Sequence, residues 1–321
     1  MNELPKLFMM VGIPGSGKSH EAKVIAKEHN AVIHASDKIR EEFSKNSNIQ
    51  GDNNFVFQQL HLRGQRDLKA GKNVVYDATN INSRRRKVFL NSIKSIPCEK
   101  IAIIMATPYE QCIKNNAERE NSIPERVIEK MYKNFQVPYY YEGFDVIQIV
   151  LWQETDYKQA LDFLKRYKDF DQENKHHRLT LGAHAEMAFE YALSRYLSGE
   201  SGYIPELAWA SLLHDCGKPF CKEFKEGDEN AHYYGHMNVG AYNSFFYTSN
   251  LNCDSLLIAW LINWHMEPFF WKKDEKLREK RLKLWGKDLF EMIEKIHEAD
   301  LIAHLKGTKQ NERKTIYGRY L

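Results

Sequence analysis

Residues Gly12–Ser19 read Gly-Ile-Pro-Gly-Ser-Gly-Lys-Ser, which is the pattern of a phosphate-binding P-loop. The apolar run Leu7–Val11 precedes this loop, and the helix-forming stretch Glu21–Ala26 follows it. This context predicts a buried strand that turns sharply into a helix whose first N–H groups point at a phosphate. The stretch therefore predicts a nucleoside triphosphate site. The alternative interpretation is a glycine-rich loop without a ligand.

The residues of this loop have separate tasks. Its glycines let backbone N–H groups approach phosphate oxygens without an intervening Cβ. Lys18 supplies a positive charge to the β- and γ-phosphates, and Ser19 supplies a hydroxyl for Mg²⁺. The predicted nucleotide-binding residues of the loop are Gly12, Gly15, Ser16, Gly17, Lys18 and Ser19.

Length and composition limit the class of protein. A chain of 321 residues suggests two domains, and 43% hydrophobic residues are enough for packed cores. The net charge of +3 means that any contact with nucleic acid must come from local patches. Five cysteines without a CxxC pair, no signal-peptide pattern and no membrane-spanning apolar run predict a reduced protein of the cytoplasm.

The pattern of the chain changes near its middle. Short apolar runs alternate with helical patterns in the first half, which predicts a parallel sheet flanked by helices. Helical patterns and loops fill the second half, so we expect an α/β domain over 1–152, a connecting segment over 153–172 and an all-α domain over 173–321. The predicted strands are Leu7–Val11, Ala31–His34, Asn73–Tyr76, Lys100–Ala106 and Val146–Leu151.

Polar residues follow the second predicted strand. Catalytic groups of an open parallel sheet lie at the carboxyl ends of its strands, so Asp37 is placed to orient and deprotonate an acceptor hydroxyl. Arg40 shares a helix face with Asp37 and can bind an acceptor phosphate. The alternative is that Ser36 or Asp37 only caps the helix.

The third predicted strand ends in Asp77-Ala78-Thr79-Asn80. An acidic residue at this place commonly supports Mg²⁺, so Asp77 is a candidate for that task. The run Arg84–Lys87 follows, and it reads equally as a solvated helix face or as a set of phosphate contacts.

A third group of candidates lies in a polar segment interrupted by Pro124. A helical lid with arginines would close over a transferred phosphate and exclude water. Arg119 is the first candidate to stabilise the transition-state charge and to contact the nucleotide, and Arg126 is the second. The alternative is that both arginines form ordinary surface ion pairs.

These residues carry a resemblance to a known family. The P-loop, Ser36-Asp37-x-x-Arg40, Asp77–Asn80 and the segment Ile123–Ile128 resemble the phage polynucleotide 5′-kinase family and its bacterial relatives over roughly residues 7 to 145. The resemblance implies that Asp37 is the general base, that Arg40 binds the 3′-side phosphate of the acceptor, and that ATP and Mg²⁺ are required.

A histidine–aspartate pair, His214-Asp215, ends an apolar helical pattern in the second half. Imidazole and carboxylate together suit Mn²⁺, Fe²⁺, Co²⁺, Ni²⁺ or Zn²⁺. The same half holds further histidines and an aspartate in or beside helical patterns, and each taken alone is as well explained by a structural role. These further candidates are His184, His236, His265 and Asp300.

This order of residues resembles the HD phosphohydrolase superfamily over roughly residues 176 to 305, with particular similarity to the HD domains attached to some tRNA nucleotidyltransferases. The resemblance implies a first metal set of His184, His214, Asp215 and Asp300, and a second metal on His236 and His265 with Asp215 as the bridge. Lys218 would hold a substrate oxygen. His232, His297 and His304 are interpreted as structural or surface residues, and His176 and His177 stay undecided.

Together the two halves predict a bifunctional enzyme that heals nucleic-acid ends, and the resemblance extends to HD-plus-kinase end-healing enzymes. One half would phosphorylate a 5′-hydroxyl, and the other would remove a 3′-phosphate or 2′,3′-cyclic phosphate, which prepares RNA or DNA ends for a separate ligase. Residues that could recognise the strand are Arg84–Lys87, Tyr139–Tyr141 and the basic tail Lys306–Arg319.

Two alternatives remain open. The first is a small-molecule or nucleoside kinase fused to an HD nucleotide phosphohydrolase, because a fold does not decide a substrate. The second is a nucleotide-sensing, RNA-binding regulator with a degenerate HD domain. Substrate scope separates the first alternative from the end-healing hypothesis, and the metal content of the protein separates the second.

Overall fold

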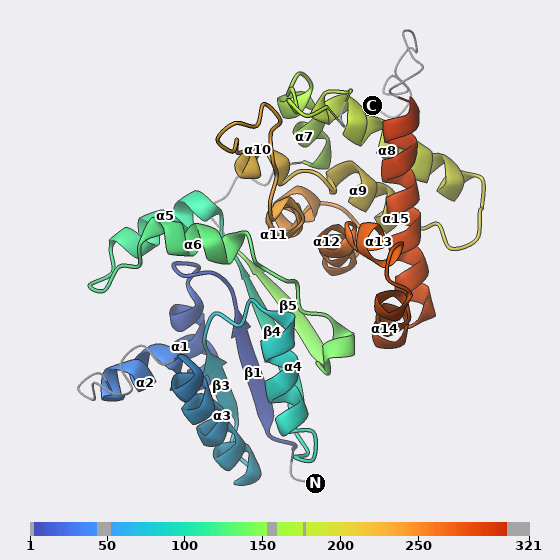
Figure 1. The fold of residues 1–321 in the computed structure, drawn as a ribbon. Coiled ribbons are helices and arrows are strands. Elements are labelled where there is room, and N and C mark those ends of the chain that lie inside the picture. Colours follow the sequence, from blue (N-terminus) through green and yellow to red (C-terminus); the bar gives the residue numbers. More distant parts are fainter. Residues whose placement is uncertain (1–2, 44–52, 153–158, 176–177, 307–321) are drawn as a thin grey trace. The chain divides into compact units, whose positions relative to one another are not determined.

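The apolar runs of the first half form a parallel sheet of five strands in the order β2-β3-β1-β4-β5 (Figure 1). All five predicted strands are confirmed, each within one residue at either end. The strands are β1 (Lys6–Val11), β2 (Val32–Ala35), β3 (Val74–Asp77), β4 (Glu99–Ala106) and β5 (Val146–Leu151).

The computed structural model describes residues 3–43, 53–152, 159–175 and 178–306. The chain divides into two compact units, Met1–Asp156 and Tyr157–Leu321. The division falls within the connecting segment that the sequence predicts over 153–172. A helix inside that segment, α7 (Ala160–Tyr167), belongs to the second unit, because its Phe163 is fully buried and lies 6.1 Å from the ring of Tyr247.

Helices and a short 3₁₀ turn surround the sheet of the first unit. In the centre of the sheet, Leu7 to Val11 are all at most 4% exposed, as expected for a parallel strand covered on both faces. The rings of His61 and Phe89 stack at 4.9 Å, which joins α3 to α4. The elements are α1 (Lys18–Glu28), α2 (Ser36–Phe43), α3 (Asn53–Lys69), α4 (Ser83–Ser92), α5 (Tyr109–Ala117), α6 (Glu125–Tyr132) and η1 (Tyr140–Glu142).

Arg86, in the middle of the basic run Arg84–Lys87, is buried, so neither predicted interpretation of the run applies to this residue. Its Nε and Nη2 both donate to the carboxylate of Glu142 at 2.7 Å. Its Nη1 donates to the carbonyl oxygens of Asn80 at 2.8 Å and Gln136 at 2.9 Å. The guanidinium therefore fixes the chain that follows β3.

The second unit is helical, as the sequence predicts. In the described part of this unit the one β-type contact is an isolated bridge between Glu223 and His232. All five cysteines lie within the described residues, and none of them forms a disulfide bond there. Besides α7, the helices are α8 (Leu181–Leu197), α9 (Pro205–Leu213), α10 (Lys218–Cys221), α11 (His236–Thr248), α12 (Ser255–Trp264), α13 (Glu267–Trp271), α14 (Glu275–Trp285) and α15 (Lys287–Lys306).

Among the described residues, none of the helices combines the length and the apolar character that a membrane crossing requires.

The buried pair of Arg86 and Glu142 predicts a large effect on stability. Glu142→Gln leaves a guanidinium buried without its counter-charge, so we expect the free energy of unfolding to fall by about 3–5 kcal/mol. Urea denaturation followed by circular dichroism measures this change. Glu42→Gln is the matched control, since Glu42 pairs with Arg63 at the surface and its loss should cost less than about 1 kcal/mol. Equal losses in the two variants would contradict the structural role of the buried pair.

Candidate functional site

The P-loop of the first unit runs from the end of β1 to the start of α1. Gly17 precedes α1 with a φ of 85°, and Gly15 has a φ of 80°. A Cβ on Gly15 would lie 2.1 Å from the carbonyl oxygen of Cys112, so this position admits only glycine. The loop therefore depends on close contact with α5 as well as on its own sequence.

Two polar side chains from beyond the predicted motifs hold this loop. Thr107 donates from Oγ1 to the carbonyl oxygen of Ser16 at 3.0 Å, and Asn115 donates from Nδ2 to that of Gly15 at 2.8 Å. The sequence analysis missed both residues. The available signal was their position directly after β4 and on the following helix, at the edge of the sheet where the P-loop lies.

Lys18 is buried, and its Nζ donates to the carbonyl oxygen of Ile13 at 2.8 Å. Burial lowers the pKa of Lys18 to about 8, although the carboxylate of Asp77 raises it. A cation in such surroundings gains from an added anion, which fits its predicted contact with phosphate.

Ser19 and Asp77 meet at the carboxyl edge of the sheet. The Ser19 hydroxyl donates to Oδ2 of Asp77 at 2.9 Å. Burial raises the pKa of Asp77, which the hydrogen bond from Ser19 partly offsets. A hydroxyl and a carboxylate are oxygen ligands of the kind that Mg²⁺ takes beside a nucleotide.

Asp37 lies between two arginines. Arg40 contacts its Oδ1 at 3.0 Å, and Arg119 contacts its Oδ2 at 3.3 Å. Their side chains are 68%, 43% and 37% exposed for Asp37, Arg40 and Arg119. Asp37 and Arg40, which the sequence predicts on one helix face, thus form one open cluster with Arg119, which the sequence predicts in a separate segment.

The segment that carries Arg119 connects α5 to α6 and is closed by a side-chain clip. Asn116 donates to the carbonyl oxygen of Ile123 at 2.8 Å and accepts from its N–H at 3.0 Å. Arg126 is exposed in the first turn of α6 and makes none of the described contacts with Asp37 or Lys18. The structure therefore brings Arg119, and not Arg126, to the predicted acceptor site.

The second unit brings six predicted side chains together. The ligand atoms of His184, His214 and Asp300 lie within 4.8 Å of one another, and those of Asp215, His236 and His265 do the same. Three of the six residues lie on α8, α11 and α15, and the other three directly follow the last residues of α9 and α12.

Asp215 faces both groups. Its Oδ2 lies 3.2 Å from Nε2 of His214, and its Oδ1 lies 3.4 Å from Nε2 of His236. Gly217 allows this approach, because a Cβ there would lie 2.1 Å from the carbonyl oxygen of His236. One carboxylate can thus bridge two ions.

Three histidines of the cluster are oriented in the same way. The Nδ1 atoms of His214, His236 and His265 each lie 2.7–2.8 Å from the carbonyl oxygen three residues earlier. At His236 and His265 this contact keeps the proton on Nδ1 and turns the Nε2 lone pair inward, whereas His214 carries a charge because, although burial opposes it, Asp215 raises the pKa of His214 to about 10. Nε2 of His236 then lies 3.4 Å from Nε2 of His265.

Two acceptor nitrogens at such a distance repel each other unless a cation lies between them. Burial lowers the pKa of His265 to about 3 and also lowers that of His236, so both imidazoles are neutral at pH 7. Although burial opposes it, the charges of His214 and Lys218 hold the pKa of Asp215 well below its usual range. The donor set fits one or two divalent metal ions.

Lys218 is buried instead of open to a substrate. Its Nζ lies 2.7 Å from Oδ2 of Asp215 and donates to Oε1 of Gln172 at 2.8 Å. Gln172 is 1% exposed, and the sequence analysis missed it because its partner lies 46 residues away. Lys218 therefore neutralises Asp215 in this arrangement.

His304, which the sequence analysis treats as structural, lies at the rim of the cluster. Its Nε2 is 3.2 Å from Oδ1 of Asp300, and its side chain is 25% exposed. The i,i+4 spacing from Asp300 on one helix was the available signal. His176, His177 and the tail residues 307–319 lie outside the described residues.

Comparison with known proteins assigns the first unit. Residues 7–138 match a family described as an AAA domain. A curated protein, L-seryl-tRNA(Sec) kinase of Methanococcus maripaludis, is 28% identical over 168 residues, which are 49% of this chain and 63% of that protein. The first unit is a P-loop domain of the kinase type.

This chain thus spans less than two thirds of the length of the curated relative. Among solved structures, a gluconokinase from Sinorhizobium meliloti 1021 is similar at 14% identity and a TM-score of 0.36, over 48% of this chain and 86% of that one. A chain of the Pnkp1/Rnl/Hen1 RNA repair complex is similar at 26% identity and a TM-score of 0.37, over 41% of this chain and 44% of that one. These TM-scores are too low to assign a substrate.

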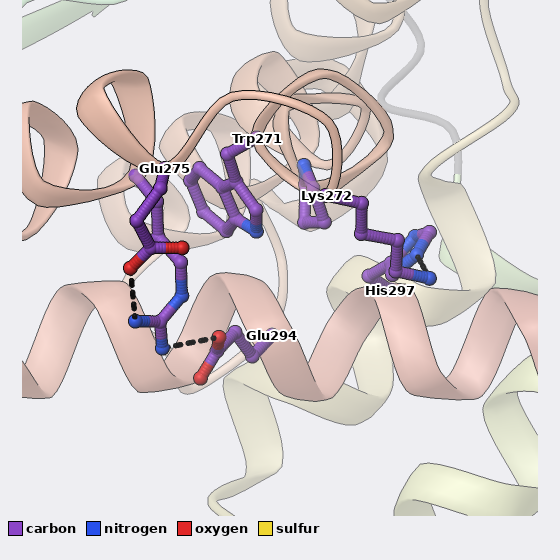
Figure 2. A pocket seen from close by; sticks show the side chains of 7 residues that line it. Trp271, Lys272, Glu275, Glu294 and His297 are labelled. Carbon is purple, nitrogen blue, oxygen red and sulfur yellow. Dashed lines mark hydrogen bonds and ion pairs between the residues drawn. The ribbon is translucent and has the colours of Figure 1, made fainter.

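Outside the P-loop kinase domain, a hollow of about 280 Å³ lies among α13, α14 and α15 (Figure 2). Lys272 and His297 meet in it, with Nζ 2.9 Å from Nε2. The other ring nitrogen of His297, Nδ1, is buried without a hydrogen-bond partner among the described residues. Burial, and then the charge of Lys272, lower the pKa of His297 to about 4.

This lowered pKa predicts a pH dependence of stability. Between pH 6.5 and 4 the unfolded state binds a proton that folded His297 does not, so the helical unit should lose about 2 kcal/mol of stability from pH 7 to 4.5. His297→Gln should remove this part of the loss. Tryptophan fluorescence during urea denaturation reports on this unit, which holds five of the six tryptophans. We expect the free energies of unfolding of the wild type and His297→Gln to change with pH in the same way above pH 7 and to diverge below it. If the two curves stay parallel down to pH 4.5, the prediction is wrong.

Proposed function

We propose that this protein is a bifunctional enzyme that phosphorylates 5′-hydroxyl ends of nucleic acid, with RNA as the first choice, and removes terminal phosphates in its helical unit. The observation that carries the kinase half is the cluster in which Asp37 lies between Arg40 and Arg119. The observation that carries the second half is the pair of histidine–carboxylate groups that share Asp215.

In the kinase reaction, the P-loop and Lys18 would bind the phosphates of ATP. Mg²⁺ at Ser19 and Asp77 would neutralise the charge that develops on the transferred phosphoryl group. Asp37 would accept the proton of the acceptor hydroxyl.

Asp37 is ion-paired with both arginines. Substrate phosphates offer the guanidiniums stronger, bidentate partners. We therefore infer that Arg40 turns to a phosphate of the acceptor and Arg119 to the transferred group, which leaves the Asp37 carboxylate available as a base.

In the helical unit, metal ions on the two groups would supply Lewis acidity toward a phosphate oxygen and lower the pKa of water. The protein's own residues hold the charge balance. Asp215 faces both groups, and Lys218 offsets its charge at Oδ2, the oxygen that also faces His214. His304, which is one-quarter exposed, marks the rim of the cluster from which a phosphate end would enter.

A second candidate function is phosphorylation of a different hydroxyl acceptor. The relative L-seryl-tRNA(Sec) kinase is named for a hydroxyl on an amino acid carried by RNA, and small-molecule or nucleoside acceptors would use the same P-loop. All these acceptors are hydroxyls. The open cluster at Asp37 favours a large acceptor, because its three side chains are each more than a third exposed.

Two variants separate the two activities. We expect Lys18→Ala to lose at least about 100-fold in phosphorylation of a 5′-hydroxyl oligonucleotide and to keep the phosphatase. Asp215→Ala should keep the kinase and lose release of phosphate from an oligonucleotide with a 3′-phosphate or a 2′,3′-cyclic phosphate. Both assays use the full chain with Mg²⁺ and Mn²⁺. If the wild type leaves both oligonucleotides unchanged but consumes nucleosides or sugars, the proposal is wrong.

Asp37 has its own prediction. Asp37→Asn should lower kcat of the kinase by about 100- to 10,000-fold, because the amide cannot accept the proton of the hydroxyl. The affinity for ATP, measured by calorimetry, should change little, because Lys18 and Asp77 are intact. Glu28→Gln removes an exposed carboxylate at the far end of α1 and serves as the control. Equal activity of Asp37→Asn and the control would exclude Asp37 as the base.

A further inference from the structure

A line of contacts leads away from the acceptor cluster along α3. Arg40 donates from Nη2 to Oδ1 of Asn53 at 3.0 Å. Asn53 and Phe57 are four residues apart on α3 and therefore share a face, about 6 Å apart along the axis. The guanidinium of Arg85 lies over the ring of Phe57, 5.3 Å from its centroid. One surface thus runs from Arg40 to Arg85.

The two helices that form this surface begin at the same edge of the sheet. Phe57 meets Arg85, and one turn further along each helix His61 stacks on Phe89 at 4.9 Å. The matching steps mean that α3 and α4 run parallel. Because α4 follows the segment after Asp77, its first turn lies at the edge that carries the P-loop.

This surface differs from an ordinary helix face because its positive charges have no carboxylate partners in the described part of the chain. Arg84 and Arg85 are both exposed, and within the described residues no carboxylate lies within ion-pair distance of either. Arg86, the next residue, is buried in its ion pair with Glu142 and holds this turn of α4 in place. Two exposed guanidiniums without a described carboxylate partner and one aromatic ring are the groups that bind the phosphates and bases of a single strand.

We propose that this surface, made of Asn53, Phe57, Arg84 and Arg85, is a subsite for single-stranded nucleic acid 3′ to the nucleotide that is phosphorylated. The inference rests on the proposed 5′-hydroxyl kinase. Phe57 stacks with a base of the second or third nucleotide, and Arg84 and Arg85 contact the phosphates that follow the one on Arg40. A duplex end is a poorer acceptor, because its bases are already stacked.

The test compares acceptors of increasing length. The full chain is assayed with ATP, Mg²⁺ and 5′-hydroxyl acceptors: a nucleoside 3′-monophosphate, oligonucleotides of about two to eight nucleotides, and a blunt duplex. We expect KM to fall as the strand lengthens. Arg85→Ala should raise KM for the longer strands by about 10-fold and leave KM for the nucleoside 3′-monophosphate unchanged. The slope of log KM against log salt concentration should decrease by about 0.7.

Two further variants make the result specific. Phe57→Leu keeps an apolar side chain on α3 and removes the ring, so it should raise KM for longer strands in the same way. Lys94→Ala removes an exposed positive charge just beyond the other end of α4 and should behave as the wild type. If Arg85→Ala and Lys94→Ala agree, or if wild-type KM is independent of strand length, the subsite is wrong while the kinase stands. If no 5′-hydroxyl acceptor is phosphorylated, the proposed function is wrong, and the subsite is wrong with it.

Discussion

The buried charge pair of Arg86 and Glu142 is the interaction on which the arrangement of the kinase site depends. It ties the first turn of α4 to η1, 56 residues later, and it holds the carbonyl group of Asn80. Asn80 adopts a left-handed φ of 47° and donates from its side chain to the carbonyl oxygen of Met10 at 2.7 Å. The backbone N–H of Gly12 donates to the carbonyl oxygen of Thr79 at 3.0 Å. Through these bonds the end of β3 and the P-loop keep one fixed spacing, which lets Ser19 reach Asp77.

The helical unit also buries charged side chains, and there the charges that need compensation are negative. Two carboxylates, Asp215 and Asp300, are about as buried as any core residue, and burial of a bare anion is unfavourable. Lys218 offsets one of them, and imidazoles surround both. The histidines at the ends of α9 and α12 use carbonyl groups that a helix end leaves unpaired, which fixes their orientation at little cost. The carboxylate oxygens and imidazole nitrogens that converge there are ligands of divalent cations, and this is the physical basis of the proposed metal cluster.

The local sequence predicted the strands and the P-loop, and it missed the side chains whose roles depend on partners far away in the chain. The five strands were predicted within one residue because each is a short, mostly apolar run, and the central strands β1, β3 and β4 are buried on both faces. The P-loop was readable because all its residues are adjacent. Arg86 was not readable, because Arg-Arg-Arg-Lys is typical of a solvated helix face and its partner is 56 residues away. Gln172 and Asn115 were missed for the same reason. A change of pattern over 153–172 predicts a subdivision there, but only packing shows that α7 belongs to the helical unit.

The exposure of the two sites bears on the kind of molecule that each can receive. The side chain of Asp37 is 68% exposed, whereas that of Asp215 is 4% exposed. An exposed carboxylate between two guanidiniums can contact a hydroxyl of a large molecule, because the rest of that molecule stays in solvent. A buried cluster can receive only a group that projects, such as a terminal phosphate. A polynucleotide satisfies both conditions, because its 5′-hydroxyl belongs to a large molecule and its terminal 3′-phosphate projects from that molecule. A free nucleotide satisfies the second condition and makes no use of the first.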